Sequence, residues 1–172
     1  IDIMIPRTLY DSDHDMFRES LRKFLEAEAM PHHEQWEKDG MVSDEIWRKA
    51  GEQGFLCPMI PEEYGGVGTD FRYNCIVNEE IGRSGCTGLG WTLHNDITVP
   101  YIVRYGSEEQ KQKYLPRCIT GELITAIAMT EPGAGSDLQG TKTTAVLDGD
   151  HYILNGSKTF ITNGQKAGLV IV

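Results

Sequence analysis

The sequence predicts an α+β protein, with an all-helical domain over residues 1–121 followed by the beginning of an antiparallel β domain over residues 122–172. Up to about Gly121, apolar residues recur at the spacing of amphipathic helices. Beyond it, runs rich in Ile, Val, Thr and Tyr alternate with turn signals. These signals, typical of hairpins or tight turns, are Asp148-Gly149, Asn155-Gly156 and Asn163-Gly164.

Three helices are expected in the first third of the chain. Ser12 predicts the N-cap of a helix over about residues 13–30, whose apolar face carries Phe17, Leu21, Phe24 and Leu25. Pro31 suits the first turn of a second, short helix that carries Trp36 and ends at Gly40. Ser43 predicts the cap of a third helix, which ends before Gly54 and has Ile46, Trp47 and Ala50 on its inner face.

An irregular stretch over residues 57–68 separates these helices from three more. The next helix is expected over residues 69–83, with Phe71, Cys75, Ile76 and Ile81 on its inner face and Ser84-Gly85 after its end. A largely buried helix then spans residues 87–105 and ends at Gly106; its apolar positions are Leu89, Trp91, Leu93, Ile97, Tyr101 and Ile102. Ser107 and Gln110 form a capping box for the last helix, which Pro116 is expected to kink or shorten.

Composition excludes several classes of partner. The net charge is −10 and no dense basic patch occurs, so nucleic acid is not expected to bind. No apolar run reaches the roughly 18 residues that cross a bilayer, and no signal peptide is evident. The four cysteines show no metal-ligand spacing, so we expect no metal site and reduced, mostly buried thiols.

Both ends of the sequence suggest a piece of a longer protein. The chain begins at Ile1 without an initiator methionine, and it stops at Val172 inside an apolar run typical of a strand. The three or four strands expected after residue 122 make an incomplete sheet.

The segment T-E-P-G-A-G-S-D at residues 130–137 is the main candidate for ligand binding. Gly133 and Gly135 lack side chains and can adopt positive φ, so the backbone can approach a ligand closely, and its N–H groups can bind phosphate. Neither G-x-G-x-x-G nor G-x-x-x-x-G-K-[ST] occurs here. From composition alone, an ordinary surface loop between strands is the more common interpretation of such a segment.

Several other polar residues have simpler interpretations. His94 is expected to be a hydrogen-bonded core histidine and is kept out of the site. Thr130 and Thr162 are also compatible with ordinary strand positions. The remaining candidates are assigned to the surface or to core packing: His32-His33 and Glu62-Glu63 to the surface, Trp36 and Trp47 to packing.

Four segments, taken together and in order, resemble the N-terminal half of an acyl-CoA dehydrogenase. They are I-P-E-E-Y-G-G at 60–66, Y-G-S-E-E-Q-K-Q-K-Y-L-P at 105–116, T-E-P-G-A-G-S-D at 130–137 and N-G-S-K-T-F-I-T-N-G at 155–164. Each segment alone is weak evidence, but the resemblance covers nearly the whole chain. The amino-acid sequences A-M-T-E-P-G-A-G-S-D-L-Q-G and L-N-G-S-K are most similar to long-chain members of the family.

The resemblance implies FAD, held where a helical domain meets a β domain. It places Ile127, Met129 and Thr130 along the isoalloxazine ring, with Thr130 serving its polar edge. Gly135 and Ser136 match positions that meet the pyrophosphate, and Ser136 also matches one that touches the acyl-CoA. A second strand against the ring corresponds to Phe160, Ile161 and Thr162. Many relatives carry Trp where this chain has Phe160, so the aromatic wall is kept and the indole N–H is lost.

The implied reaction is α,β-dehydrogenation of a fatty acyl-CoA to trans-2-enoyl-CoA in fatty acid β-oxidation. In the family, a glutamate removes the α-proton, the β-hydride passes to the flavin, and an electron-transferring flavoprotein accepts the electrons. That glutamate belongs to the family's C-terminal helical domain, which is absent here, so no residue up to Val172 is assigned as catalytic and this chain alone is expected to be inactive. The resemblance also implies a homotetramer or homodimer.

Some alternatives stay open from the sequence. An acyl-CoA oxidase would share the scaffold but let oxygen reach the reduced flavin. A flavin-free module that binds acyl-CoA or protein would share the fold without the chemistry. The compartment is expected to be cytoplasmic for a bacterial protein and the mitochondrial matrix for a eukaryotic one.

Overall fold

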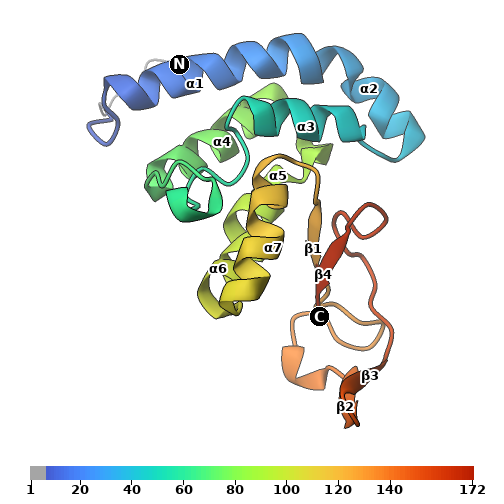
Figure 1. Cartoon of the computed structure of the whole chain (residues 1–172). Helices are drawn as coiled ribbons and strands as arrows, with labels where there is room; N and C mark the ends of the chain where they lie inside the picture. The colour runs from blue at the N-terminus through green and yellow to red at the C-terminus, as the bar shows by residue number, and fades with distance from the viewer. Residues whose placement is uncertain (1–6) are drawn as a thin grey trace. The chain divides into compact units, whose positions relative to one another are not determined.

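The computed structural model describes residues 7–172, and the chain divides into two compact units after Leu123 (Figure 1). The first unit is helical and the second holds two small sheets, which confirms the predicted fold class. The helices are α1 (Ser12–Phe24), α2 (Met30–Asp39), α3 (Asp44–Glu52), α4 (Phe71–Ser84), α5 (Trp91–Leu93), α6 (Val99–Tyr105) and α7 (Glu108–Ile119). The strands are β1 (Thr125–Ile127), β2 (Thr144–Asp148), β3 (His151–Asn155) and β4 (Leu169–Ile171).

The first helical run differs from the prediction at both ends. Its N-cap is Asp11 rather than Ser12, because the Asp11 side chain accepts hydrogen bonds from the backbone N–H groups of Asp13 and His14, at 3.1 and 3.3 Å. The helix does not stop near residue 30 but continues through a π-helical turn, Leu25–Ala29, into α2. Pro31 lies in the first turn of α2 and Gly40 ends it in the left-handed conformation, both as predicted.

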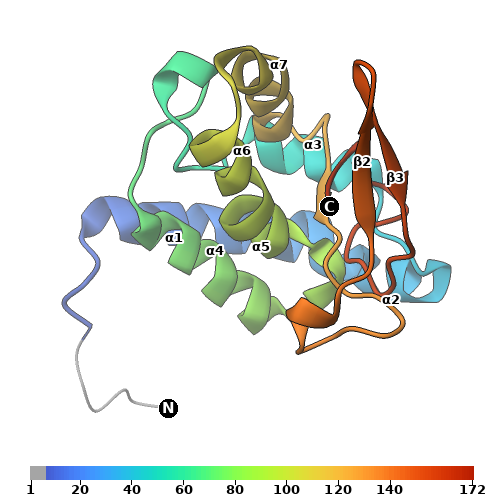
Figure 2. The ribbon, with the colours of Figure 1, turned by 90° about the horizontal axis from the view of Figure 1, so that it is seen from below.

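Helix α3 follows the sequence prediction closely. The Ser43 hydroxyl accepts a hydrogen bond from the Ile46 N–H, and Ile46, Trp47 and Ala50 are buried. These residues join a core that includes Leu21, Leu25, Phe55, Ile76, Leu89, Trp91 and Leu115. Helix α4 lies beside α1 and closes one side of this core (Figure 2). Phe71, expected on its inner face, is 55% exposed because it is the first residue of the helix.

The predicted helix over residues 87–105 is broken into shorter pieces. A 3₁₀ turn (Thr87–Leu89) and α5 are followed by a π-helical turn, His94–Thr98, before α6 begins. A π-helical turn adds a residue to the repeat, so apolar positions that share a face of a regular α-helix no longer do so across it. Ile97 and Tyr101, expected to be buried, are therefore 41% and 44% exposed.

Pro116 does not shorten the last helix, which runs to Ile119. The capping box of Ser107 and Gln110 is present at its start, as predicted. Near the end of α7 the chain packs tightly against α3. A Cβ on Gly51 would lie 2.5 Å from the carbonyl carbon of Thr120, and one on Gly121 would lie 2.3 Å from the Trp47 carbonyl oxygen.

The β unit contains one antiparallel and one parallel pair of strands. Strands β2 and β3 form the predicted hairpin at Asp148-Gly149, with Gly149 at φ 65°. Strands β1 and β4 pair in parallel, with Thr125 opposite Leu169, because the chain completes the hairpin before it returns to β1. The other two turn signals form no hairpin: Asn155 ends β3, and Asn163 adopts φ 63° in the turn that leads to β4.

Two predictions from composition can be compared with the described residues. All four cysteines are free, and Cys57, Cys86 and Cys118 are buried, which confirms the expected thiols. Burial raises the pKa of Cys118 to about 12, so this thiol stays protonated. Across residues 7–172, no helix combines the length and the apolar character that crossing a membrane requires.

Candidate functional site

The residues predicted to bind a cofactor all lie in the β unit, on three segments. Ile127 ends β1, and Met129 and Thr130 follow it in the loop. Gly135 and Ser136 lie further along this loop, and both are exposed. The third segment, residues 160–162, comes after β3 and before β4.

Backbone hydrogen bonds bring the first and third of these segments together. The Thr159 N–H donates to the Thr130 carbonyl at 2.9 Å, one residue before Phe160. The Ala128 N–H donates to the Ile171 carbonyl at 2.7 Å and extends the pairing of β1 with β4. The segments that carry Thr130 and Phe160, far apart in sequence, are therefore joined side by side in the β unit.

A tight turn shapes the loop that carries the second segment. The Glu131 N–H donates to the Ala134 carbonyl at 2.9 Å, and the Ala134 N–H donates back to the Glu131 carbonyl at 3.1 Å. Gly133 and Gly135 do not use the positive φ open to glycine. A Cβ at either position would meet no atom of the chain within 4 Å, so the backbone here borders open space.

Phe160 combines two unusual features. Its backbone adopts φ 55°, a region that residues other than glycine rarely occupy, and its side chain is highly exposed, since the residue is 91% exposed. Strained backbone of this kind is concentrated at functional sites. Thr162 is also exposed, Ile161 is half-buried, and Met129 is 44% exposed on the linked segment.

Glu131, which the sequence interpretation did not single out, connects the site's segments. Its carboxylate accepts hydrogen bonds from the N–H groups of Lys142 and Thr143, from the Thr143 hydroxyl, and from Lys158 Nζ. The Thr143 hydroxyl, the Lys142 N–H and Lys158 together lower the pKa of Glu131 to about 2. The sequence does carry a signal for it, because Glu131 is a single carboxylate between the apolar run at residues 123–129 and the glycines of the following turn.

His94 lies in the helical unit and is a core residue, as predicted. It is fully buried, and its Nε2–H donates to the Cys118 carbonyl at 3.1 Å. Burial lowers the pKa of His94 to about 4, so the ring is neutral near pH 7. The surface assignments of Glu62-Glu63 and His32 agree with their exposure, while His33 is half-buried.

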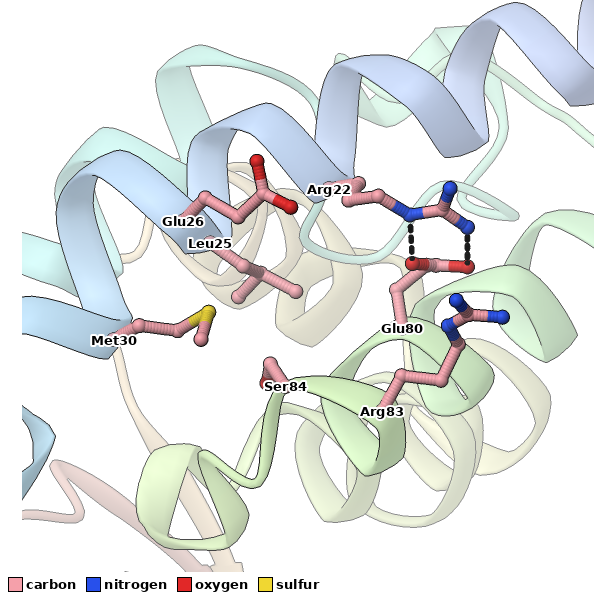
Figure 3. A pocket seen from close by; sticks show the side chains of 7 residues that line it. All are labelled: Arg22, Leu25, Glu26, Met30, Glu80, Arg83 and Ser84. Atoms are coloured by element: carbon pink, nitrogen blue, oxygen red, sulfur yellow. Dashed lines mark hydrogen bonds and ion pairs between the residues drawn. The ribbon is translucent and has the colours of Figure 1, made fainter.

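A second polar feature of the helical unit is a pocket of about 140 Å³ (Figure 3). Arg22 of α1, the π-helical turn and the start of α2 line one side of it, and Glu80, Arg83 and Ser84 of α4 line the other. Glu80 is 2% exposed and receives two 2.9 Å hydrogen bonds from Arg22 and a third, at 3.0 Å, from Arg18. Burial alone would raise the pKa of Glu80, but the arginines outweigh it and the pKa is below its usual value. The charges therefore compensate one another, and we assign these groups to helix packing. No cluster of three metal-binding side chains occurs within residues 7–172.

Comparison with known proteins places this geometry in a family. The acyl-CoA dehydrogenase N-terminal domain matches residues 11–122, and the acyl-CoA dehydrogenase middle domain matches residues 126–172. The chain is 56% identical over 166 residues to a mitochondrial long-chain specific acyl-CoA dehydrogenase of Sus scrofa. That match covers 96% of this chain and 39% of the relative, so the chain spans about two fifths of that protein's length.

Solved structures are similar over the same region. An acyl-CoA dehydrogenase from Geobacillus kaustophilus is 58% identical, with a TM-score of 0.93 over 96% of this chain and 43% of its own. An acyl-CoA dehydrogenase from Bacillus anthracis, complexed with FAD, is 39% identical, with a TM-score of 0.89 over 98% of this chain and 29% of its own. The predicted resemblance is thus confirmed, and this chain belongs to the acyl-CoA dehydrogenase family.

Proposed function

We propose that this chain forms part of the FAD site of an enzyme that oxidises fatty acyl-CoA thioesters to trans-2-enoyl-CoA in β-oxidation. The observation that carries the proposal is Phe160, an exposed aromatic ring on strained backbone, held next to Thr130 by the Thr159–Thr130 hydrogen bond. The Bacillus anthracis relative, which is complexed with FAD, supports the choice of cofactor.

The residues of the β unit suit a flavin. A flat ring needs an apolar or aromatic wall and hydrogen bonds to its polar edge, and a pyrophosphate needs donors that it can approach closely. Ile127, Met129 and Phe160 would supply the wall. Ile161 would extend this wall, because it follows the exposed Phe160 in the segment after β3.

Polar contacts would come from the same segments. The hydroxyls of Thr130 and Thr162 are suited to the polar edge of the ring. Gly135 and Ser136 are suited to the pyrophosphate, because both are exposed and a Cβ on Gly135 would meet nothing in the chain. Ser136 would also touch the acyl-CoA. Bound there, FAD would accept the hydride that leaves the β-carbon of the substrate.

Glu131 is the buried carboxylate nearest these residues in sequence, but it is not suited to remove the α-proton. Four donors already occupy its oxygens, and its pKa of about 2 makes it a weak base. We propose that the catalytic base lies outside residues 1–172 and that this chain alone does not catalyse the reaction.

The wider assignment follows the family. We propose that residues 1–121 act as the helical domain and residues 122–172 as the start of the β domain, in a homotetramer or homodimer. An electron-transferring flavoprotein would be the electron acceptor. The compartment would be the cytoplasm or the mitochondrial matrix.

The first test is an anaerobic titration of the full-length protein that contains this sequence with palmitoyl-CoA, following the flavin absorbance band. Bleaching supports both the cofactor and the dehydrogenation. A flavin band that persists contradicts the substrate assignment, and the absence of any flavin favours a flavin-free binding module. Rapid reoxidation of the reduced protein by oxygen would indicate an oxidase instead.

A further inference from the structure

We propose that Glu131 and Lys158 are positioning residues of the FAD site. Their ion pair would hold the loop after β1 and the segment after β3 at a fixed spacing, so that Thr130 and Phe160 contribute to one binding surface. This inference rests on the proposed function, and it concerns side chains that have no assigned role in that function.

The pair is largely removed from water. Lys158 Nζ lies 2.9 Å from Glu131 Oε1, and the side chains are 15% and 6% exposed. By contrast, every residue of the neighbouring strands β2 and β3 is exposed. Salt screens a shielded ion pair only weakly, and removal of one partner strongly destabilises the protein because the other charge stays buried. Such a pair can therefore define the position of the segments that carry it.

Residues 129–131, after β1, form hydrogen bonds with Lys158 and Thr159, after β3. Lys158 Nζ donates to the Met129 carbonyl at 2.9 Å as well as to Glu131. Between these two contacts, the Thr159 N–H donates to the Thr130 carbonyl. This arrangement fixes the spacing of the two segments immediately before Phe160.

Glu131 adds a third segment. Its carboxylate accepts N–H hydrogen bonds at 2.7 Å from Lys142 and 2.9 Å from Thr143, where the chain enters β2. An ionised carboxylate has about four acceptor positions, and four donors are present, so Glu131 has little capacity left for a ligand. Its contribution to binding would therefore be indirect, through the loop that carries Thr130 and Ser136.

Removing the lysine charge should release this arrangement. In Lys158→Met, Glu131 loses one of its four donors and the Met129 carbonyl loses its partner, while the Thr159–Thr130 hydrogen bond remains. Phe160 has a strained φ of 55°, so its position depends on the residues that precede it.

The test uses the full-length protein, stripped of flavin and titrated with FAD. We expect Lys158→Met to weaken FAD binding about 10- to 100-fold, by analogy with residues that hold metal ligands in place. The visible flavin band should also shift and broaden, because the surroundings of the ring are less well ordered. Lys158→Arg keeps the charge and should recover most of the affinity.

Two further variants separate positioning from folding and from charge. Lys142→Met removes an exposed lysine but keeps the backbone N–H that binds Glu131, so it should bind FAD like the wild type. Glu131→Gln keeps the size of the side chain and loses its charge, and we expect about tenfold weaker binding. Thermal unfolding of each apoprotein identifies variants that fail to fold.

FAD affinity and the flavin band together distinguish three outcomes. Folded Lys158→Met and Glu131→Gln proteins that bind FAD with wild-type affinity and an unchanged flavin band would overturn it, while the proposed function would stand. A wild-type protein that binds no FAD would instead overturn the proposed function itself. Weaker binding in both variants, with recovery in Lys158→Arg, supports the positioning role.

Discussion

The rings of Trp47 and His94 meet edge to face in the core of the helical unit, with their centroids 5.3 Å apart and their planes at 80°. Trp47 belongs to α3, and His94 opens the π-helical turn that precedes α6. The same imidazole donates to the Cys118 carbonyl of α7, so one buried ring joins three elements. Burial disfavours the charged form of this ring and lowers the pKa of His94, although the hydrogen bond to Cys118 acts in the opposite direction.

The stability of the helical unit should therefore fall with pH in a defined window. The pKa of His94 is about 4 in the folded chain and about 6.5 when unfolded, so the unfolded state binds the proton first. Stability is fully present above about pH 6.5 and decreases as the pH falls towards 4, by about 3 kcal/mol in total. Urea unfolding followed by tryptophan fluorescence measures it, since Trp36, Trp47 and Trp91 all precede residue 124.

His94→Gln is the control for this window. It removes the titrating ring, so the difference between variant and wild type cancels the carboxylates that titrate below pH 5. If both proteins lose stability in parallel between pH 6.5 and 4, His94 is not the group responsible.

Two helical glycines should respond in opposite directions to alanine. Gly51→Ala places a Cβ 2.5 Å from backbone atoms of Thr120, which cannot move without shifting α7, and we expect a loss of about 2 kcal/mol. Gly82 lies within α4 with nothing within 4 Å of its Cβ position, so Gly82→Ala should gain up to about 1 kcal/mol from helix propensity. The same unfolding experiment measures both. A Gly51→Ala protein as stable as the wild type would contradict the close packing of α3 against residues 119–120, and a destabilised Gly82→Ala protein would contradict the open space beside Gly82.

The ion pairs between α1 and α4 should differ in strength according to burial. Glu80→Ala leaves Arg18 and Arg22 without their buried partner, and we expect a loss of about 2 kcal/mol, below the full effect of a buried pair because Arg22 is 41% exposed. Glu79 is 32% exposed, so Glu79→Ala should cost less than about 1 kcal/mol. Equal losses in chemical unfolding would show that burial does not distinguish the two carboxylates.

Phe160 should separate stability from binding. Phe160→Gly removes an exposed ring and relieves the strain at φ 55°, so the chain should become more stable by about 1 kcal/mol, measured by thermal unfolding. FAD binding by the full-length protein should weaken at least about tenfold, because the wall for the ring is lost. Phe160→Tyr keeps the aromatic face and should bind FAD normally. Unchanged affinity in Phe160→Gly would remove this residue from the site.

Local patterns in the sequence were sufficient to predict many of the caps, helix ends and buried faces of the helical unit. The cap at Ser43, the capping box at Ser107, the ends at Gly40 and Gly85, and the inner face of α3 all depend on residues a few positions apart. The same holds for the hairpin at Asp148-Gly149. Caps and tight turns are formed by short-range hydrogen bonds, which is why the nearby residues alone predict them.

Tertiary structure decided what these local patterns could not. The π-helical turns shifted which residues face inward, and α7 continued through Pro116 with Leu115 and Cys118 packed in the core. The sequence pointed to Thr130 and Phe160 by resemblance, but only the folded chain shows the hydrogen bond that links their segments and the buried Glu131–Lys158 pair beside it. Such contacts join residues about 30 positions apart, and no local preference encodes them, since their energy appears only when the chain excludes water from both partners.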